Sequence, residues 1–147
     1  MDPHNDTIYA PASLADAGGI CIVRVSGPRA KETLQKVFDR PVCNKPRVLT
    51  YGRVRDNERV LDACMAVFFP GPRTYTCEDV AELHLHASPA GVAAVLALLA
   101  SMGLRLAAPG EFTRRAFMNG RIDLSGAEAV MEYITAQTRA GAEAALS

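Results

Sequence analysis

Two short apolar segments carry charged side chains, and these side chains are the first candidates for chemistry. In an extended segment 20–26, alternation places Arg24 on the same face as two isoleucines. A buried guanidinium is costly without a partner, so Arg24 requires a carboxylate, backbone carbonyls, an anionic ligand or the open rim of a sheet. In segment 80–86 the same alternation places Glu82 beside His84 and His86. Glu82 is therefore a candidate partner for Arg24. The role of Arg24 stays open: it can bind a ligand, form a structural salt bridge or lie at the edge of a sheet.

The two histidines also raise the question of a metal site. A structural zinc ion takes four ligands, and no third histidine or paired cysteine stands near His84 and His86 in the sequence. The four cysteines are far apart and form no C-x-x-C pair. Two of them lie in apolar runs, where a thiol packs as a small hydrophobic side chain. We therefore predict no metal site, and a reducing, cytoplasmic environment.

Strands must position these residues, and the sequence predicts several of them. Turn residues and β-branched runs indicate extended segments at 20–26 and 80–86, two more between residues 48 and 69, and a short one at 104–107. The polar cluster at 56–59 is typical of a hairpin turn.

Helices are expected between these strands. The first should cover 29–38, and a second follows Ser88 as N-cap and ends at Gly103. A long helix is expected after residue 124, because Ser125-Gly126-Ala127-Glu128 has the spacing of a capping box. Strands alternating with helices, with at least one hairpin, predict an α+β domain with a mixed sheet and packed helices.

Composition narrows the functional classes. The 16 basic and 16 acidic side chains balance, so no net field favours non-specific binding of nucleic acid. No apolar run approaches the length of a membrane span, and no signal peptide precedes the domain. No G-x-x-x-x-G-K-[ST] loop occurs, so this chain should neither bind nor hydrolyse GTP. Glu111, Arg114 and Arg115 are interpreted as surface ion pairs near the start of a short helix, and no catalytic residue is assigned.

Three segments, in order, resemble one family of proteins. They are Gly18-Gly19-Ile20-Cys21-Ile22-Val23-Arg24-Val25-Ser26-Gly27-Pro28, the run from Phe69 to Leu83, and the run from Pro109 to Ala129. Together they resemble the N-terminal domain of the tRNA-modification GTPases called MnmE or TrmE. The resemblance implies half of the folate-binding fold of aminomethyltransferases, completed by pairing with a second copy. It further implies residues 1–122 as the folate-binding and dimerisation domain, and 123–147 as the start of a truncated helical domain.

The resemblance also implies a ligand and partners. Positions that match Arg24, Glu82 and Arg121 contact 5-formyltetrahydrofolate in the family. A carboxylate suits the paired N–H donors of the pterin ring, and arginine suits the carboxylates of the glutamate tail. The whole protein would act on the wobble uridine of tRNA together with the flavoprotein MnmG. GTP, magnesium and potassium would belong to a GTPase domain beyond residue 147.

Three of the positions at which the chain departs from the family are usually glycine. Cys77, Ala87 and Ser88 stand where the family usually has glycine. Because glycine allows positive φ or close approach of a ligand, the added Cβ atoms could reshape the pocket rim. An alternative function is therefore a dimerisation module that has lost folate. A free-standing aminomethyltransferase-like enzyme is a third and weaker interpretation.

Overall fold

The computed structural model describes the backbone of residues 6–12 and 19–146, and side-chain surroundings as far as residue 140 except at Thr138. Its strands form one six-stranded sheet in the order β3-β4-β5-β2-β1-β6. Among these described strands only β1 and β6 pair in parallel, so the sheet is mixed. The predicted α+β class is confirmed. The strands are β1 (Ile8–Pro11), β2 (Ile20–Ser26), β3 (Thr50–Asp56), β4 (Arg59–Phe69), β5 (Val80–His86) and β6 (Arg105–Leu106).

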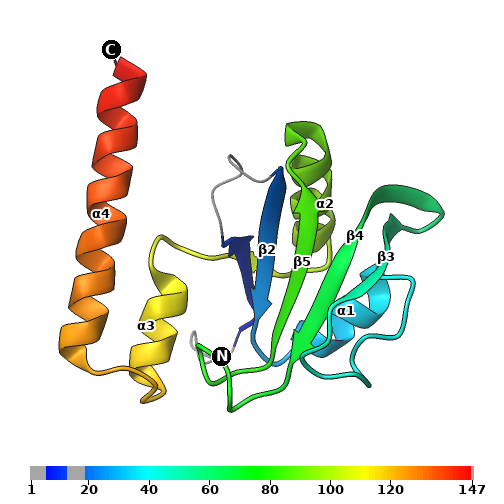
Figure 1. Cartoon of the computed structure of the whole chain (residues 1–147), viewed down its shortest axis with the longest axis horizontal. Helices are drawn as coiled ribbons and strands as arrows, with labels where there is room; N and C mark the ends of the chain where they lie inside the picture. Colours follow the sequence, from blue (N-terminus) through cyan, green and yellow to red (C-terminus); the bar gives the residue numbers. More distant parts are fainter. Residues whose placement is uncertain (1–5, 13–18, 147) are drawn as a thin grey trace.

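Within the described ranges four helices accompany the sheet, and they fall into two pairs. The first pair packs on one sheet face, while the second pair stands beside the edge of the sheet at which β1 lies (Figure 1). The helices are α1 (Ala30–Val37), α2 (Pro89–Ser101), α3 (Glu111–Met118) and α4 (Leu124–Leu146). No helix among the described residues combines the length and apolar character needed to cross a membrane.

The core lies between the sheet and the α1–α2 pair. Alternate residues of β2 and β5 point into it, because successive side chains of a strand face opposite ways. Full burial of such side chains contributes about 1.5–3 kcal/mol each, which makes this face the main source of stability. The buried members of the core include Val23, Val25, Leu83, Leu85, Val95 and Leu99.

Local signals explain most of the element boundaries. The β3–β4 hairpin turns at Asn57, which takes φ 55°, a conformation that asparagine tolerates. Ser88 caps α2 by accepting a hydrogen bond from the Gly91 N–H at 3.3 Å, and Gly103 follows the helix at φ 85°. These predictions are confirmed.

Two local features differ from expectation. The long helix exists, but the capping box at Ser125 is wrong, because α4 begins at Leu124. The Asp123 carboxylate accepts from the Gly126 N–H at 2.7 Å instead, so a carboxylate satisfies one of the free amides of the first turn. Strand β1 was not predicted, since four residues are too few to show a period.

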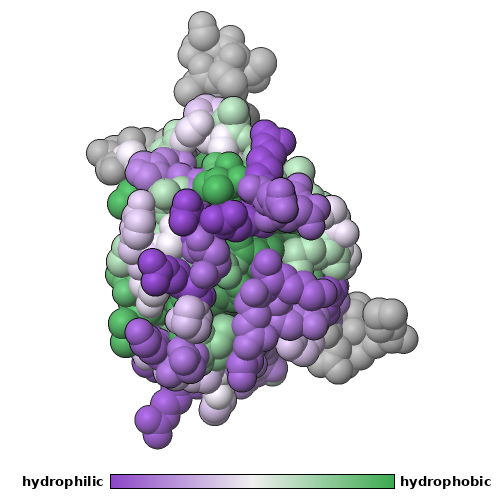
Figure 2. All heavy atoms as spheres, turned by 90° about the vertical axis from the view of Figure 1, so that its right-hand side faces the viewer, coloured by the Kyte–Doolittle hydropathy of each residue, from purple (hydrophilic) through white to green (hydrophobic). Residues whose placement is uncertain are grey.

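In the part of the sheet that the structure describes, neither outer edge is a long strand with all of its backbone groups free. At one edge β6 is only 2 residues long. At the other edge Phe38 forms a bridge with Val54, and the Asp39 N–H donates to the Arg53 carbonyl at 3.0 Å. Figure 2 faces this side of the molecule and shows mostly hydrophilic side chains, with apolar patches between them.

Candidate ligand-binding site

The register of the sheet brings the two charged strand residues face to face. Strands β2 and β5 are antiparallel neighbours, and Arg24 is directly opposite Glu82. The Arg24 Nε and Nη2 atoms both donate to Glu82 Oε2, each at 3.1 Å. Because Val23 and Val25 lie in the core, this pair occupies the sheet face that α1 and α2 leave uncovered.

Glu82 is held as a carboxylate by two partners. Its Oε1 atom lies 3.0 Å from His84 Nε2, and its side chain is 14% exposed. The hydrogen bond with His84 and the charge of Arg24 lower the pKa of Glu82 and outweigh the opposing effect of burial. The carboxylate is therefore ionised at neutral pH and fixed in orientation.

Helix α3 supports the same pair from the side. The Arg24 guanidinium lies over the Phe112 ring, 5.4 Å from its centroid, a favourable cation–π geometry. The arginine side chain keeps 26% exposure. Arg24 is thus in contact with one carboxylate and one aromatic ring, and with solvent on its remaining side.

A pocket of about 260 Å³ opens beside this pair and brings all three predicted residues together. Arg24 and Glu82 come from the sheet, and Arg121 comes from the loop between α3 and α4. One carboxylate faces several guanidiniums, which gives the pocket a positive balance suited to an anionic ligand. The lining is Arg24, Arg47, Phe69, Arg73, Thr74, Tyr75, Val80, Glu82 and Arg121.

Two arginines of this lining were missed by sequence reasoning. Arg47 has φ 66° and lies over the Phe69 ring at 5.7 Å from its centroid. Its Nη2 atom donates to the Arg73 carbonyl, which joins it to the loop after β4. Arg47 lies in an irregular segment without periodicity, so no sequence signal could have placed it here. Arg73 lies within the second family segment, but no periodicity of the sequence around it indicated which way its side chain points.

A separate cluster surrounds Arg115, and its interpretation as surface charge is wrong. The Arg115 side chain is only 5% exposed. It donates to Asp6 and Glu78 and lies 3.6 Å from the Glu111 carboxylate. Packing of α3 against the chain near Asp6 and the loop before β5 buries this side of the helix. Arg105 pairs with Asp6 and Glu111 at the outer side of the cluster.

The three departures from glycine lie at different places relative to the pocket. Cys77 takes φ 63°, so this position does require the conformation for which glycine is favoured. It belongs to the loop that supplies Thr74 and Tyr75 to the pocket, without lining the pocket itself. Ala87 and Ser88 follow the C-terminal end of β5, whereas Val80 at its N-terminal end lines the pocket. Neither Ala87 nor Ser88 is part of the lining.

The remaining titratable groups do not form a second site. His86 pairs with Asp62 at 2.9 Å, apart from His84. In the part of the chain that the structure describes, no group of three metal-ligating side chains is close enough to hold an ion. Burial raises the pKa of the Cys64 thiol to about 12, so this thiol is unreactive at neutral pH. A hollow of about 400 Å³ along α4 is lined by residues of that helix alone.

Comparison with known proteins gives one consistent result. The family model described as "GTP-binding protein TrmE N-terminus" matches residues 7–121. A protein of Roseiflexus sp. (strain RS-1) named "tRNA modification GTPase MnmE" is 50% identical over 92% of this chain and 30% of its own length. Proteins of the same name from Alkaliphilus oremlandii and Nitratidesulfovibrio vulgaris are 45% and 48% identical, over 97% and 94% of this chain. The chain spans less than a third of their length, at 32% and 31%.

Proposed function

The chain belongs to the family of TrmE N-terminal domains, and we propose that it binds a tetrahydrofolate and forms a homodimer within a GTPase that modifies tRNA. In this proposal the folate supplies the one-carbon unit for a 5-carboxymethylaminomethyl-type modification of the wobble uridine. Residues 1–122 form the folate-binding and dimerisation domain, and 123–147 begin a helical domain. The proteins named as relatives are tRNA modification GTPases, which supports the coarser part of this proposal.

The observation that carries the folate assignment is the union of Arg24, Glu82 and Arg121 in one pocket. A pterin ring offers an amide N–H and a neighbouring amino group as parallel donors, and an ionised carboxylate such as Glu82 can accept both. The arginines supply positive charge for the carboxylates of the glutamate tail. The donor set therefore fits 5-formyltetrahydrofolate or another tetrahydrofolate.

A specific observation also favours the second candidate, a dimerisation module without folate. Both oxygens of Glu82 already have protein partners, Arg24 on one and His84 on the other. If this ion pair is purely structural, the pterin donors find no acceptor that is free. Folate binding then requires Glu82 to share its remaining lone pairs or Arg24 to turn toward the ligand.

Calorimetric titration with 5-formyltetrahydrofolate separates the two candidates. We expect Glu82→Ala to weaken binding by roughly 30- to 1,000-fold, because two pterin donors lose a charged acceptor. Arg24→Ala should weaken it comparably, since Arg24 orients Glu82, and Arg121→Ala should also weaken it. Arg59→Ala, which removes an exposed arginine outside the pocket, should change nothing.

Absence of folate binding would contradict the first candidate. A folded wild-type chain that shows no heat of binding and no thermal shift at millimolar folate overturns the folate assignment. The dimerisation module then remains, and Glu82→Ala should lower thermal stability in the absence of any ligand.

The other partners follow from the proposed parent protein. We propose that the flavoprotein MnmG and tRNA engage the full-length protein, and that GTP, magnesium and potassium bind its GTPase domain. For the chain itself we expect no magnesium-dependent phosphate release from GTP, since it has no phosphate-binding glycine loop. Sedimentation equilibrium at micromolar concentration should give twice the 15.7 kDa of one chain, and a monomer alone contradicts the dimer.

A further inference from the structure

Three arginines at the edge of the pocket carry charge that the protein does not neutralise. Arg47, Arg73 and Arg121 are exposed and line the same pocket as Glu82. Within the described ranges none of the three forms an ion pair with a carboxylate. Arg24 differs, since its charge is matched by Glu82. We refer to Arg47, Arg73 and Arg121 as the cationic rim.

Part of the rim lies beyond the sheet residues that would meet a pterin. On the uncovered face, Glu82 pairs across to Val67, and the next pair along the same strands is Phe69 with Val80. Arg47 lies over Phe69, so it is displaced from Glu82 along the strands by about two residues, or roughly 7 Å. A ligand whose ring meets Glu82 therefore reaches Arg47 with its tail.

The size of the pocket also indicates that the ring lies inside it and the tail lies at the rim. Its volume is about 260 Å³, below the ~300–1,000 Å³ of pockets that enclose a drug-sized ligand. The ring system of a folate can occupy this space, but the glutamate tail must project from it. The part that projects is the anionic part, and the residues around the opening are arginines.

We propose that the cationic rim binds a poly-γ-glutamate tail, so that the site selects polyglutamylated tetrahydrofolates over the monoglutamate. This inference rests on the proposed function and specifies the ligand of the same site. Each added glutamate contributes one α-carboxylate, and arginine binds carboxylates through two parallel N–H donors. The hydrogen bond and ring contact of Arg47 restrict its side chain before the tail arrives, which reduces the entropy lost on binding.

The test compares one ligand in two lengths. Calorimetry measures the affinity of the chain for 5-formyltetrahydrofolate with one and with five glutamates. We expect the pentaglutamate to bind roughly threefold to thirtyfold more tightly at low salt, as the sum of several exposed ion pairs. Raising the ionic strength to about 0.5 M should remove most of that advantage, because exposed pairs are screened.

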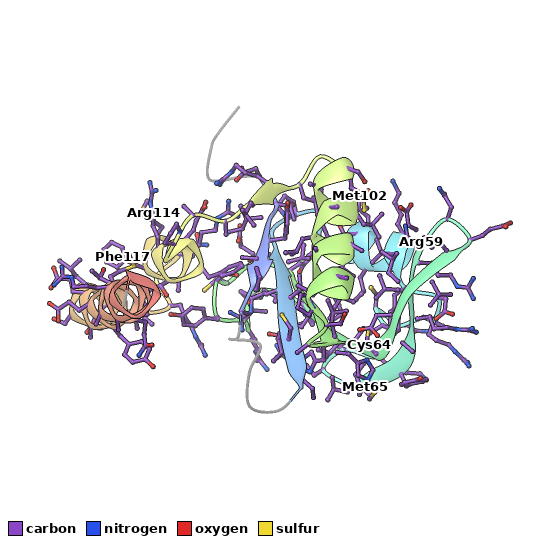
Figure 3. All side chains as sticks on the ribbon, turned by 90° about the horizontal axis from the view of Figure 1, so that it is seen from above. Arg59, Cys64, Met65, Met102, Arg114 and Phe117 are labelled. Carbon is purple, nitrogen blue, oxygen red and sulfur yellow. The ribbon has the colours of Figure 1, made fainter. Side chains whose placement is uncertain are left out.

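The variant Arg47→Ala/Arg73→Ala tests whether the rim is responsible. It should weaken binding of both ligands, but the pentaglutamate several-fold more than the monoglutamate, because the longer tail makes more ion pairs with the rim. Most of the pentaglutamate advantage should therefore be lost. The matched control is Arg59→Ala/Arg114→Ala, which also removes two charges. Figure 3 labels both control residues, Arg59 by the β3–β4 hairpin and Arg114 on α3, and neither lines the pocket.

The outcomes distinguish this inference from the function on which it rests. Equal affinities for the two ligand lengths overturn the tail preference and leave folate binding intact. A pentaglutamate advantage that survives the rim variant, or that falls equally in the control, also overturns it, because the tail is then bound elsewhere or by net charge. Absence of binding by either ligand overturns the folate assignment itself.

Discussion

Arg24 and Arg115 both bind carboxylates on the same side of the sheet, but their surroundings differ. Arg115 is 5% exposed and lies among the carboxylates of Asp6, Glu78 and Glu111. Arg24 is 26% exposed, has Glu82 as its carboxylate, and borders a pocket. Burial and the number of anionic neighbours thus distinguish an arginine that holds elements together from one that remains accessible from a pocket.

The two regions are joined by the loop between β4 and β5. Glu78 from this loop contacts Arg115 and accepts a hydrogen bond from Ser26 Oγ at 2.8 Å. Thr74 and Tyr75 from the same loop line the pocket, and the Tyr75 hydroxyl lies 2.9 Å from Thr113 Oγ1 on α3. The Arg115 cluster therefore fixes the loop that supplies part of the pocket lining, together with helix α3, which precedes Arg121.

The largest expected effect follows from removing Arg115. Arg115→Met should lower the free energy of unfolding by about 3–5 kcal/mol, because it leaves the Glu78 carboxylate, which is only 15% exposed, without its cation and removes the bonds of a buried guanidinium to Asp6. Urea denaturation measures this loss. Arg115→Lys restores the charge and should recover part of the stability. A loss below about 1 kcal/mol would mean that Arg115 behaves as a surface residue and that the contrast with Arg24 is incorrect.

A smaller effect is expected at the other arginine. Glu82→Gln should cost the ligand-free protein no more than about 1 kcal/mol, since Arg24 is partly exposed and retains its Phe112 contact. The same urea experiment applies, with Met65→Leu on the neighbouring strand as the control for a change on this face. A cost equal to that of Arg115→Met would place Arg24 and Glu82 among the structural ion pairs.

The connecting loop should gain stability when its strained residue is relieved. Cys77 adopts φ 63°, so Cys77→Gly should raise the free energy of unfolding by about 0.5–1 kcal/mol, the strain removed less the entropy that glycine adds to the unfolded chain. Cys77→Ala keeps the Cβ atom and should show no gain. If glycine and alanine give the same stability in thermal melts, the backbone at this position is not strained.

The smallest effect concerns pH. Hydrogen bonds from Arg105 are the main cause that lowers the pKa values of Asp6 and Glu111. A carboxyl group whose folded-state pKa is lowered stabilises the fold above its unfolded pKa, near 3.8 for aspartate and 4.5 for glutamate, and this stability is lost as the pH falls. Stability should therefore decrease from about pH 5 to about pH 3.

Arg105→Gln should make that decrease shallower, by less than about 1 kcal/mol because these groups are partly exposed. The slope due to Glu82 should remain, since its pKa is lowered by His84 and Arg24. Urea denaturation at several pH values, with Arg59→Gln as control, gives both slopes. An unchanged slope in Arg105→Gln would mean that Arg105 does not lower the pKa values of Asp6 and Glu111.

Much of the fold was predictable from the sequence because its signals are local. Alternation in 20–26 and 80–86 identified β2 and β5. It also placed Arg24 and Glu82 on the strand faces opposite Val23 and Leu83. The turn at Asn57 and the caps of α2 follow from single residues. The sequence alone could not show that β2 pairs with β5, which are 58 residues apart at the Arg24–Glu82 contact.

The remaining errors have the same physical origin. Arg115 was interpreted as a surface residue because α3 is short and polar, and only the packing of distant segments buries it. Arg47 lies in an irregular segment whose path depends on contacts with Phe68 and Phe69. Arg121 was placed in the site by family resemblance, since no periodicity connects a loop residue with the sheet.

The modified edges of the sheet have a consequence for the behaviour of the protein at high concentration. An unpaired strand edge can template the addition of another chain and lead to aggregation. Here β6 is too short to offer a useful template, and the opposite edge carries Arg53 and Arg55, both bound to Asp39. An incoming strand would have to displace these charged contacts. The folded chain is thereby protected against growth into extended β-assemblies.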